Sequence, residues 1–404
     1  MSAMLEFGEA LLRLLAEAHP VGATEPVPTW SAAGRVLAGG LCSAIDVPPL
    51  DNTSMDGYAV RCADVPVAGA KLAVAQRIPA GSVGHVLAPG TAARIFTGAP
   101  VPAGADAVVM QELCELAGDT LTVNHVPKAG EWIRRRGEDI AVGAEVLAAG
   151  TRLAAAHVGV AASVGAAQLT VFRRLRVALF STGDELAMPG EPLKPGGIYN
   201  SNRYTLRALL DGLGCEVADL GIVPDSREAT RAALREAAAG NDLILTSGGV
   251  SVGEEDHVKP AVEAEGALDL WKIAIKPGKP LAFGSVRRAG GDGAAAFIGL
   301  PGNPVSSFVT FLVLVRPFIL KAQGATKLRP RAQGLQADFE YKGDPRREFL
   351  RARINAEGGL ELFPNQSSGV LTSCTWADGL IDNPPGQPIR CGDTVRFLPF
   401  SELL

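Results

Sequence analysis

LTSGGVSVGEEDHVK, residues 245–259, is the stretch of sequence that decides the fold. It continues a short apolar run that begins near residue 242. An apolar run that ends in glycine is typical of a strand buried in a parallel sheet and of the loop at its carboxyl end. Gly248 and Gly249 would let the backbone approach a ligand closely and would direct amide groups towards an anion. The stretch therefore predicts a buried strand and one wall of a binding site.

The segments around this stretch alternate between strand and helix patterns. Strands are predicted by apolar runs at 177–181, 216–223, 242–246 and 295–300. Helical patterns occupy 202–213, 225–239 and 304–323. Asp225, with Glu228 three residues later, has capping-box spacing and predicts the start of the second helix. Because strands alternate with helices, we expect a doubly wound, mostly parallel sheet with helices on both faces, and we assign it to residues 176–326.

The rest of the chain predicts three further parts. Residues 47–140 are rich in Val, Gly and Pro and contain short strand-like runs, which indicates a β-rich domain. Residues 1–46 and 141–175 have helical and extended patterns on either side of it, so the β-rich domain would be an insertion. Residues 327–404 combine short strands with turn signals and predict a C-terminal β domain. The predicted fold class is therefore multidomain α/β.

Residues 153–172 carry no formal charge, which raises the question of a membrane span. The segment is rich in Ala and Gly and contains polar side chains, so its hydrophobicity is too low for one. It predicts instead a buried helix that turns at Gly165 into a strand. The first 20 residues lack the basic region of a signal peptide. We expect no membrane partner.

Composition and charge exclude several classes of protein. The net charge is −5, and the one basic cluster, residues 134–136, is too small for the broad positive face that nucleic acid requires. That cluster fits a small anionic ligand or a solvated surface. The six cysteines include no CxxC pair, so neither a zinc ribbon nor a redox pair is indicated. A reduced, cytoplasmic location is the simplest interpretation.

Carboxylates and small residues follow the predicted parallel strands, where such sheets bind ligands. Glu185, Asp225 and Asp256 each come after a different strand, and carboxylate oxygens are suitable ligands for Mg²⁺. Asn303 can cap a helix that begins at Pro304, and the free amides of a helix start bind oxyanions. The alternatives are structural: Asp225 as a cap only, residues 183–184 as a simple turn, and residues 301–304 as a plain helix start.

Three lysines, Lys272, Lys276 and Lys279, form a second candidate group. Alternation along residues 271–276 would place Lys272 and Lys276 on one face of a single strand, with Lys279 after the following turn. Three ammonium groups so placed could hold phosphates. A solvated strand face is the alternative.

The segment GVSVG, residues 249–253, matches the nucleophile elbow of serine hydrolases. That fold needs a histidine later in the chain, and only His257 follows Ser251. Six residues are too few for His257 to come from a separate loop. A hydrolase triad is therefore disfavoured. If a fluorophosphonate probe does not label the protein, the serine hydrolase hypothesis is excluded.

Turn-like segments in the β-rich region add further polar candidates. They contain Asp56 beside a glycine, Thr97, and Arg134 with Asp139 in a run of cations and carboxylates. For Asp56 with Gly57, a plain hairpin turn is the strong alternative.

Taken together, these segments resemble the signature segments of the MoeA family of molybdopterin molybdenumtransferases and of the E domain of gephyrin. The matching strings, in order, are DNTSMDGYA (51–59), TGAP (97–100), RRRGED (134–139), STGDEL (181–186), NSN (200–202), SGGVSVGEED (247–256), IKPGKPLAF (275–283), LPGNPV (300–305) and QSSG (366–369). The resemblance covers essentially the whole chain.

The resemblance implies an activity, a substrate and an assembly. Members bind adenylylated molybdopterin and molybdate, cleave the adenylate with Mg²⁺, insert molybdenum into the dithiolene and release AMP. They are homodimers with a MogA-like sheet domain, and the active site lies between the sheet domain of one subunit and the β-rich domain of the other. A MogA-like molybdopterin adenylyltransferase would supply the substrate, and apo-molybdoenzymes or their chaperones would accept the product.

The resemblance also assigns roles to residues of this chain. The expected catalytic residues are Asp56, Thr97, Glu185, Asp225 and Asp256, the last three also as Mg²⁺ ligands. The expected substrate-binding residues are Gly248, Gly249, Ser251, Lys272, Lys276, Lys279, Pro301, Asn303, Pro304, Asp139 and Arg134. The alternative function is a non-catalytic scaffold with the same fold, as gephyrin also uses its E domain to anchor receptors. The presence of the carboxylates favours the enzyme.

Overall fold

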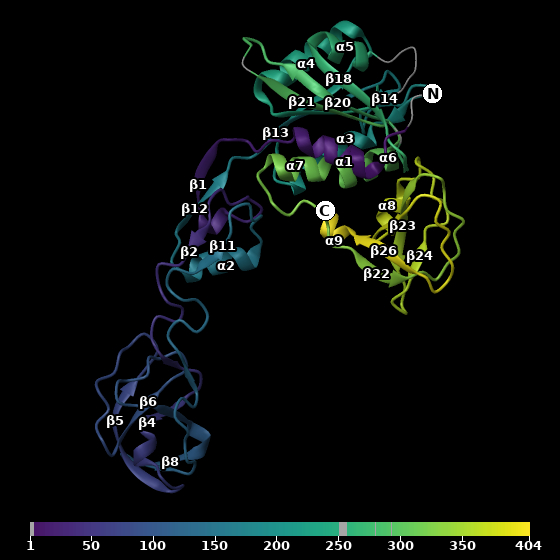
Figure 1. The fold of residues 1–404 in the computed structure, drawn as a ribbon. Coiled ribbons are helices and arrows are strands. Elements are labelled where there is room, and N and C mark those ends of the chain that lie inside the picture. The colour runs from purple at the N-terminus through teal and green to yellow at the C-terminus, as the bar shows by residue number, and fades with distance from the viewer. Residues whose placement is uncertain (1–3, 250–256, 279, 292) are drawn as a thin grey trace.

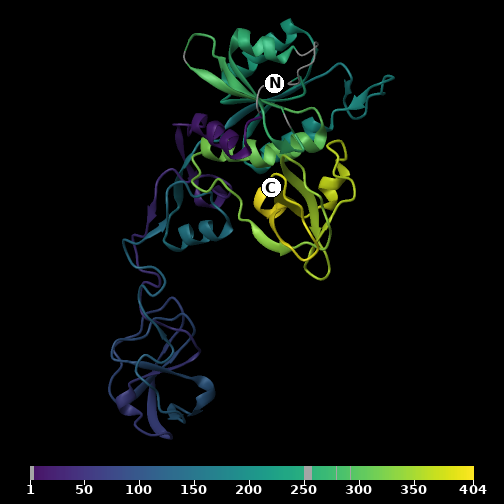
Figure 2. The same ribbon diagram turned by 45° about the vertical axis from the view of Figure 1, so that its right-hand side comes forward.

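The computed structural model describes residues 4–249, 257–278, 280–291 and 293–404. An α/β unit and a C-terminal β unit lie beside each other, and a β-rich unit stands at the far end of two extended segments (Figure 1). The same elongated arrangement is visible in the turned view (Figure 2). The two segments run antiparallel: β1 (Thr24–Pro28) pairs with β12 (Gln168–Phe172), and β2 (Leu41–Cys42) pairs with β11 (Glu145–Leu147). The β-rich unit is therefore an insertion, as predicted.

The α/β unit contains a six-stranded sheet with the order β16-β13-β17-β21-β20-β18. Its strands are β13 (Arg176–Thr182), β16 (Glu216–Val223), β17 (Leu243–Ser247), β18 (Gly266–Lys272), β20 (Pro280–Arg287) and β21 (Ala294–Leu300). β16, β13, β17 and β21 are parallel, whereas β20 and β18 continue the sheet in antiparallel pairings. The predicted mostly parallel sheet is confirmed, and the hairpin of β18 and β20 adds to it.

Helices cover both faces of this sheet. α4 (Arg227–Gly240) and α5 (Val258–Glu265) share a core with Phe180, Ile244 and Phe297. The opposite face meets α1 (Phe7–Glu17), α3 (Ser201–Gly212) and a long helix made of α6 (Pro304–Thr310), the π-helical turn η4 (Phe311–Val315) and α7 (Arg316–Ala322). In each strand, alternate side chains point to opposite faces of the sheet. One half of the buried strand residues therefore packs in the core on the α4 and α5 face, and the other half packs in the core on the opposite face.

Two features of the helices differ from prediction. α4 begins at Arg227, and its N-cap is Ser226, whose side chain accepts a hydrogen bond from Ala229 N. Asp225 is therefore not the cap of this helix. The helix α1 packs on α7, and its buried Leu11 and Leu14 belong to the core of the α/β unit. It thus lies with the sheet and not with β1 and β12.

The segment predicted to be a buried helix forms α2 (Ala155–Ser163), followed by a turn at Gly165 with φ +80° and then β12. Only Ala161 of α2 is buried, so the prediction of a buried helix is wrong. Its small side chains leave most of the helix at the surface. Among the described residues, the one helix long and apolar enough to span a membrane is Pro304–Ala322, of which 89% of the apolar window is buried inside the fold.

The β-rich unit is a six-stranded sheet with the order β7-β4-β6-β5-β9-β8. Its strands are β4 (Gly57–Val60), β5 (Ala70–Ile78), β6 (Thr91–Ile95), β7 (Ala107–Met110), β8 (Cys114–Ala117) and β9 (Thr120–Val123). Beside them, β3 (Asn52–Thr53) pairs with β10 (Ile133–Arg134). The short turns of this unit carry the polar candidates named above.

The C-terminal β unit contains β22 (Gln333–Gln336), β23 (Arg347–Ile354), β24 (Leu360–Leu362), β25 (Gly379–Asn383) and β26 (Thr394–Pro399), with the short helices α8 (Thr372–Trp376) and α9 (Phe400–Leu403). A sixth strand, β19 (Ile275–Lys276), comes from the middle of the α/β unit and pairs in parallel with β23. The prediction of one strand over residues 271–276 is therefore wrong. The chain leaves the first sheet after Lys272 and enters the second at Ile275, so the alternation spans two sheets.

The candidate active-site cleft

A cleft of about 1080 Å³ lies at the carboxyl ends of the parallel strands, between the α/β unit and the C-terminal β unit. The α/β unit lines it with Thr182, Gly183, Glu185, Leu186, Ile198, Tyr199, Asn200, Ser201, Asn202, Asp225, Ser247, Gly248, Gly249, Pro277, Gly278, Pro280, Pro301, Gly302, Asn303, Pro304 and Ser306. Lys276 of β19 and the C-terminal residues Arg346, Gln366, Ser367, Ser368 and Gly369 complete the lining. The strand ends thus converge on one cavity.

The structure brings together most of the residues predicted from the strand ends. Those in the lining are Glu185, Asp225, Gly248, Gly249, Lys276, Pro301, Asn303 and Pro304. Lys272, the last residue of β18, is not among them. Ser251, Asp256 and Lys279 lie outside the described residues. The chemical roles of all these residues remain predictions.

The paired glycines form part of the floor. A Cβ on Gly248 would lie 2.8 Å from Thr182 O, and one on Gly249 would lie 2.5 Å from the Val258 side chain. Both also have positive φ, so glycine is required on both counts. Gly248 N donates to Leu300 O at 3.1 Å, so this amide is committed to the sheet edge. The expectation that it would face an anion is therefore wrong.

The start of the long helix faces the cleft. α6 begins at Pro304 after Asn303, as predicted, although the Asn303 side chain makes no capping hydrogen bond. Asn202 Nδ2 donates to Gly302 O at 2.7 Å and so holds the turn before the helix. The first amides of a helix carry partial positive charge and favour an oxyanion. Here, however, Pro304 has no N–H and Val305 N donates to Ser368 O at 3.0 Å, so the first two helical positions offer no amide to an oxyanion and the helix start contributes only its partial positive charge.

Two carboxylates, Glu185 and Asp225, stand in the lining. A Cβ on Gly183 would lie 2.5 Å from Glu185 Oε2, so glycine is needed for this carboxylate to fold back over the turn. Within the described ranges, no three His, Cys, Asp or Glu side chains are close enough together to hold a metal ion. Mg²⁺ usually takes only one or two protein carboxylates and completes its shell with phosphate and water. Glu185 and Asp225 fit that requirement.

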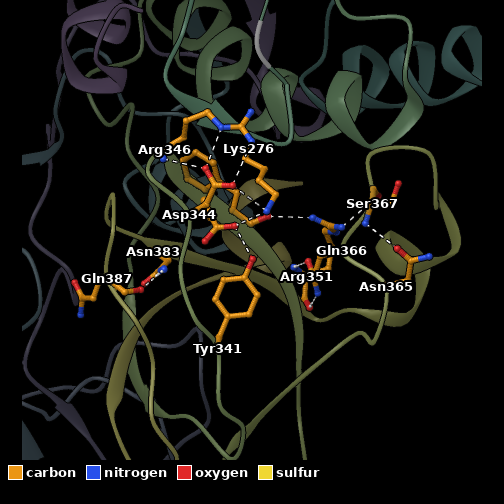
Figure 3. Close-up of polar contacts among 12 residues, drawn as sticks. Lys276, Tyr341, Asp344, Arg346, Arg351, Asn365, Gln366, Ser367, Asn383 and Gln387 are labelled. Carbon is orange, nitrogen blue, oxygen red and sulfur yellow. Dashed lines mark hydrogen bonds and ion pairs between the residues drawn. The ribbon is translucent and has the colours of Figure 1, made fainter.

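Lys276 is held by carboxylates of the C-terminal unit (Figure 3). Its Nζ lies 3.0 Å from Glu348 Oε1 and 3.2 Å from Asp344 Oδ2. Burial disfavours the ammonium charge, but the hydrogen bonds with Glu348 and Asp344 outweigh it and raise the pKa of Lys276. The alternative of a freely solvated lysine is therefore excluded, and Lys276 is a fixed positive charge at the cleft wall.

Arg346 is a second cation of the lining that reasoning from the strand ends missed. Arg346 N and Nε each donate to Asp344 Oδ1 at 3.0 Å. The pKa of Asp344 is well below its usual range, first because of the Arg346 side chain and also because of Lys276. Arg346 precedes a strand of another sheet, so no pattern within the α/β region could have placed it here. The nearby segment 366–369 was indicated only by the family resemblance.

The candidates in the β-rich unit form a separate group. Asp56 Oδ1 accepts hydrogen bonds from Thr97 N at 2.7 Å and from Thr97 Oγ1 at 2.8 Å. These bonds, the backbone one first, lower the pKa of Asp56. Residues 52–139 contribute nothing to the cleft of the same chain, and the β-rich unit lies at the opposite end of the molecule (Figure 1). Asp56 and Thr97 thus come together, but away from Glu185 and Asp225.

The basic run of the β-rich unit is largely paired. Arg135 Nη1 lies 2.7 Å from Asp51 Oδ2, and Arg136 forms an ion pair with Asp46. Arg134, opposite Asn52 in the pair of β10 and β3, is exposed, as is Asp139. Of the cations in residues 134–136, Arg134 therefore remains the candidate for an external anion.

Comparisons with known proteins agree with this architecture. Residues 5–165 match the MoeA N-terminal region (domain I and II), residues 178–321 match the probable molybdopterin binding domain, and residues 335–400 match the MoeA C-terminal region (domain IV). The molybdopterin molybdenumtransferase of Haemophilus influenzae is 40% identical over 99% of this chain and 100% of its own length. That of a Nostoc species is 38% identical over 93% of this chain and 88% of its own.

A solved structure extends the agreement to three dimensions. The molybdopterin biosynthesis MoeA protein from Pyrococcus horikoshii OT3 superposes with a TM-score of 0.82 at 28% identity, covering 98% of this chain and 100% of that one. The fold and its cleft thus define a multidomain transferase of molybdenum cofactor biosynthesis. Within that class, the chain belongs to the MoeA family, whose curated relatives are named molybdopterin molybdenumtransferase. The family and the enzyme class expected from the sequence are confirmed.

Proposed function

We propose that this enzyme transfers molybdenum from molybdate to adenylylated molybdopterin, in a Mg²⁺-dependent reaction that releases AMP. The observation that carries the proposal is the composition of the cleft. Glu185 and Asp225 stand in the α/β part of its lining, whereas Lys276 and Arg346 stand at the C-terminal unit. Such a cleft can bind a substrate that carries phosphates together with a metal ion.

Each part of the cleft has a defined task in this proposal. Glu185 and Asp225 would hold Mg²⁺, which stabilises negative charge on phosphate oxygens during cleavage of the adenylate. Lys276 and Arg346 would add fixed positive charge in the opposite wall. The start of α6, whose Val305 amide already donates to Ser368 O, would contribute the partial positive charge of its helix end. Asp256, Ser251 and Lys279 would also take part in catalysis or substrate binding. Ser251 and Lys279 are close in sequence to Gly249 and Gly278 of the lining, and Asp256 follows in the same stretch of sequence as Ser251.

We further propose that the working unit is a homodimer. Asp56 and Thr97, with Arg134 and Asp139, would complete the cleft of the partner subunit, since they are remote from the cleft of their own. The substrate donor would be a molybdopterin adenylyltransferase, and the acceptors would be apo-molybdoenzymes or their chaperones. We propose a cytoplasmic location. The proposed domains are 1–46 with 141–175, 47–140, 176–326 and 327–404, except that α1 packs with the sheet of the third domain.

Molybdate-dependent release of AMP tests the function. Purified protein is mixed with adenylylated molybdopterin, Mg²⁺ and molybdate, and AMP is quantified by chromatography. We expect AMP only when both ions are present, and a loss of about 100-fold or more in rate for Glu185→Gln. The substitution Glu191→Gln, on the neighbouring loop but outside the lining, is the matched control. A folded protein that releases no AMP would favour the scaffold alternative.

A further inference from the structure

The C-terminal β unit contains a buried carboxylate, that of Glu348, which pairs with a lysine of the cleft lining. Glu348, on β23, is fully buried, and its Oε2 makes no hydrogen bond within the part of the chain that the structure describes. Leaving a buried carboxylate oxygen unpaired is costly. The other oxygen, Oε1, accepts a hydrogen bond from Tyr341 at 2.6 Å and lies 3.0 Å from Lys276 Nζ. The carboxylate is thus directed to one lysine.

The backbone register fixes this pair. Lys276 stands directly opposite Glu348 in the parallel pairing of β19 and β23, and Ile275 stands opposite Arg347. Ile275 is buried, which anchors the two-residue strand in the joint core. A segment of the α/β unit is therefore held in register by the C-terminal sheet at the position of Lys276.

The carboxylates that pair with Lys276 both belong to the C-terminal β unit. The neighbours of Lys276 are Glu348, Asp344 and Tyr341 of the C-terminal unit, with Arg346 bound to Asp344 (Figure 3). About one third of the Lys276 side chain is exposed, and it lines the cleft. Lys276 lines the cleft whereas Glu348 and Asp344 do not, so the ammonium group stands between these carboxylates and the cavity that would hold a ligand.

We propose that Glu348 and Tyr341 are positioning residues, which hold the Lys276 ammonium group at the wall of the cleft. Tyr341 fixes the carboxylate by its hydrogen bond, and the carboxylate fixes the ammonium group. Neither residue lines the cleft, so neither contacts the substrate. This inference rests on the proposed function of the cleft as a site for anionic substrate.

The substitution Glu348→Gln tests the proposal because it keeps the shape of the side chain and removes its charge. Burial still disfavours the ammonium charge in the variant, while the hydrogen bond with a charged acceptor is lost, so the pKa of Lys276 falls. Binding of inorganic molybdate is measured by calorimetry from pH 7 to beyond pH 11, because the pKa of Lys276 in the wild-type protein is raised above its ordinary value of 10.5. We expect the alkaline loss of affinity to move to lower pH by about one unit or more. Tyr341→Phe should move it by less.

The matched control is Asp382→Asn. Asp382 is also a buried carboxylate of the C-terminal sheet, but it pairs with Arg347 and Arg396 and does not line the cleft. It should lower the stability of the sheet and leave the pH dependence of molybdate affinity unchanged. An unchanged pH dependence in Glu348→Gln, or equal shifts in both variants, would overturn the proposal. If wild-type protein neither binds molybdate nor releases AMP, the proposed function itself has failed.

Discussion

At the scale of single residues, the chemistry depends on how each charged group is held. Asp56 is exposed, yet two hydrogen bonds from Thr97 keep its pKa low. Lys276 is half-buried, yet its carboxylate partners keep its pKa high. In both cases the ionised form is fixed at neutral pH and points in a defined direction. Such preorganised charges are what the proposed cleavage of the adenylate would require.

The Thr97 hydroxyl is predicted to keep Asp56 ionised. In Thr97→Val one of the two hydrogen bonds is lost, so the pKa of Asp56 should rise towards its usual value of 3.8 while the backbone bond remains. Because the native pKa is lowered, Asp56 becomes protonated only in acid, and the variant should reach this point at a higher pH. Carboxyl NMR titration measures the shift. Thr97→Ser keeps the hydroxyl and should titrate as wild type, and a shift of equal size there would contradict the assignment.

At the scale of elements, boundaries decide which side chains are free for chemistry. Ser226 caps α4, and Asp225, two residues after the end of β16, stands in the cleft lining. β19 belongs to a second sheet, so Lys276 and Lys272 lie in different sheets although only three residues lie between them in the sequence. The sequence predicted the ends of the helices and strands to within a few residues. The predicted start of α4 was nevertheless off by two residues, and this moved the capping role from Asp225 to Ser226.

Separate substitutions of Ser226 and Asp225 should therefore have opposite effects. Ser226→Ala should cost about 1 kcal/mol of helix stability, seen as faster hydrogen exchange of the first amides of α4, with AMP release nearly unchanged. Asp225→Asn should lower AMP release about 100-fold or more while the same amides keep their protection. Faster exchange in Asp225→Asn than in Ser226→Ala would restore the capping role to Asp225.

At the scale of the whole molecule, the β-rich unit, which contains Asp56 and Thr97, lies at the end of an elongated chain opposite the α/β and C-terminal units that line the cleft (Figure 1). The arm formed by β1, β12, β2 and β11 carries the β-rich unit away from the sheet. Under the proposed assignment of functional residues, a single chain of this shape holds two incomplete sets. A second copy that offers its own β-rich unit to the cleft would complete both.

Mixed dimers test this arrangement. A dimer of Asp56→Ala with Glu185→Ala contains one complete site if the residues act across the interface, so about half the wild-type AMP release is expected. A dimer of wild type with the double variant then has no complete site and should be inactive. The reverse pattern would show that both residues act within one chain. Light scattering of the wild-type protein should give the mass of a dimer.

The sequence by itself determined the parallel sheet, the inserted β-rich unit and the convergence of Glu185, Asp225 and residues 301–304 on one edge, because these follow from local patterns and from the topology of strands and helices. Only the tertiary structure decided that α2 is exposed, that α1 packs on the sheet, and that β19 joins the C-terminal unit. Those outcomes depend on packing between distant segments. Arg346 and Glu348 became part of the site for the same reason: a second sheet brings them to Lys276, and no local pattern encodes that contact.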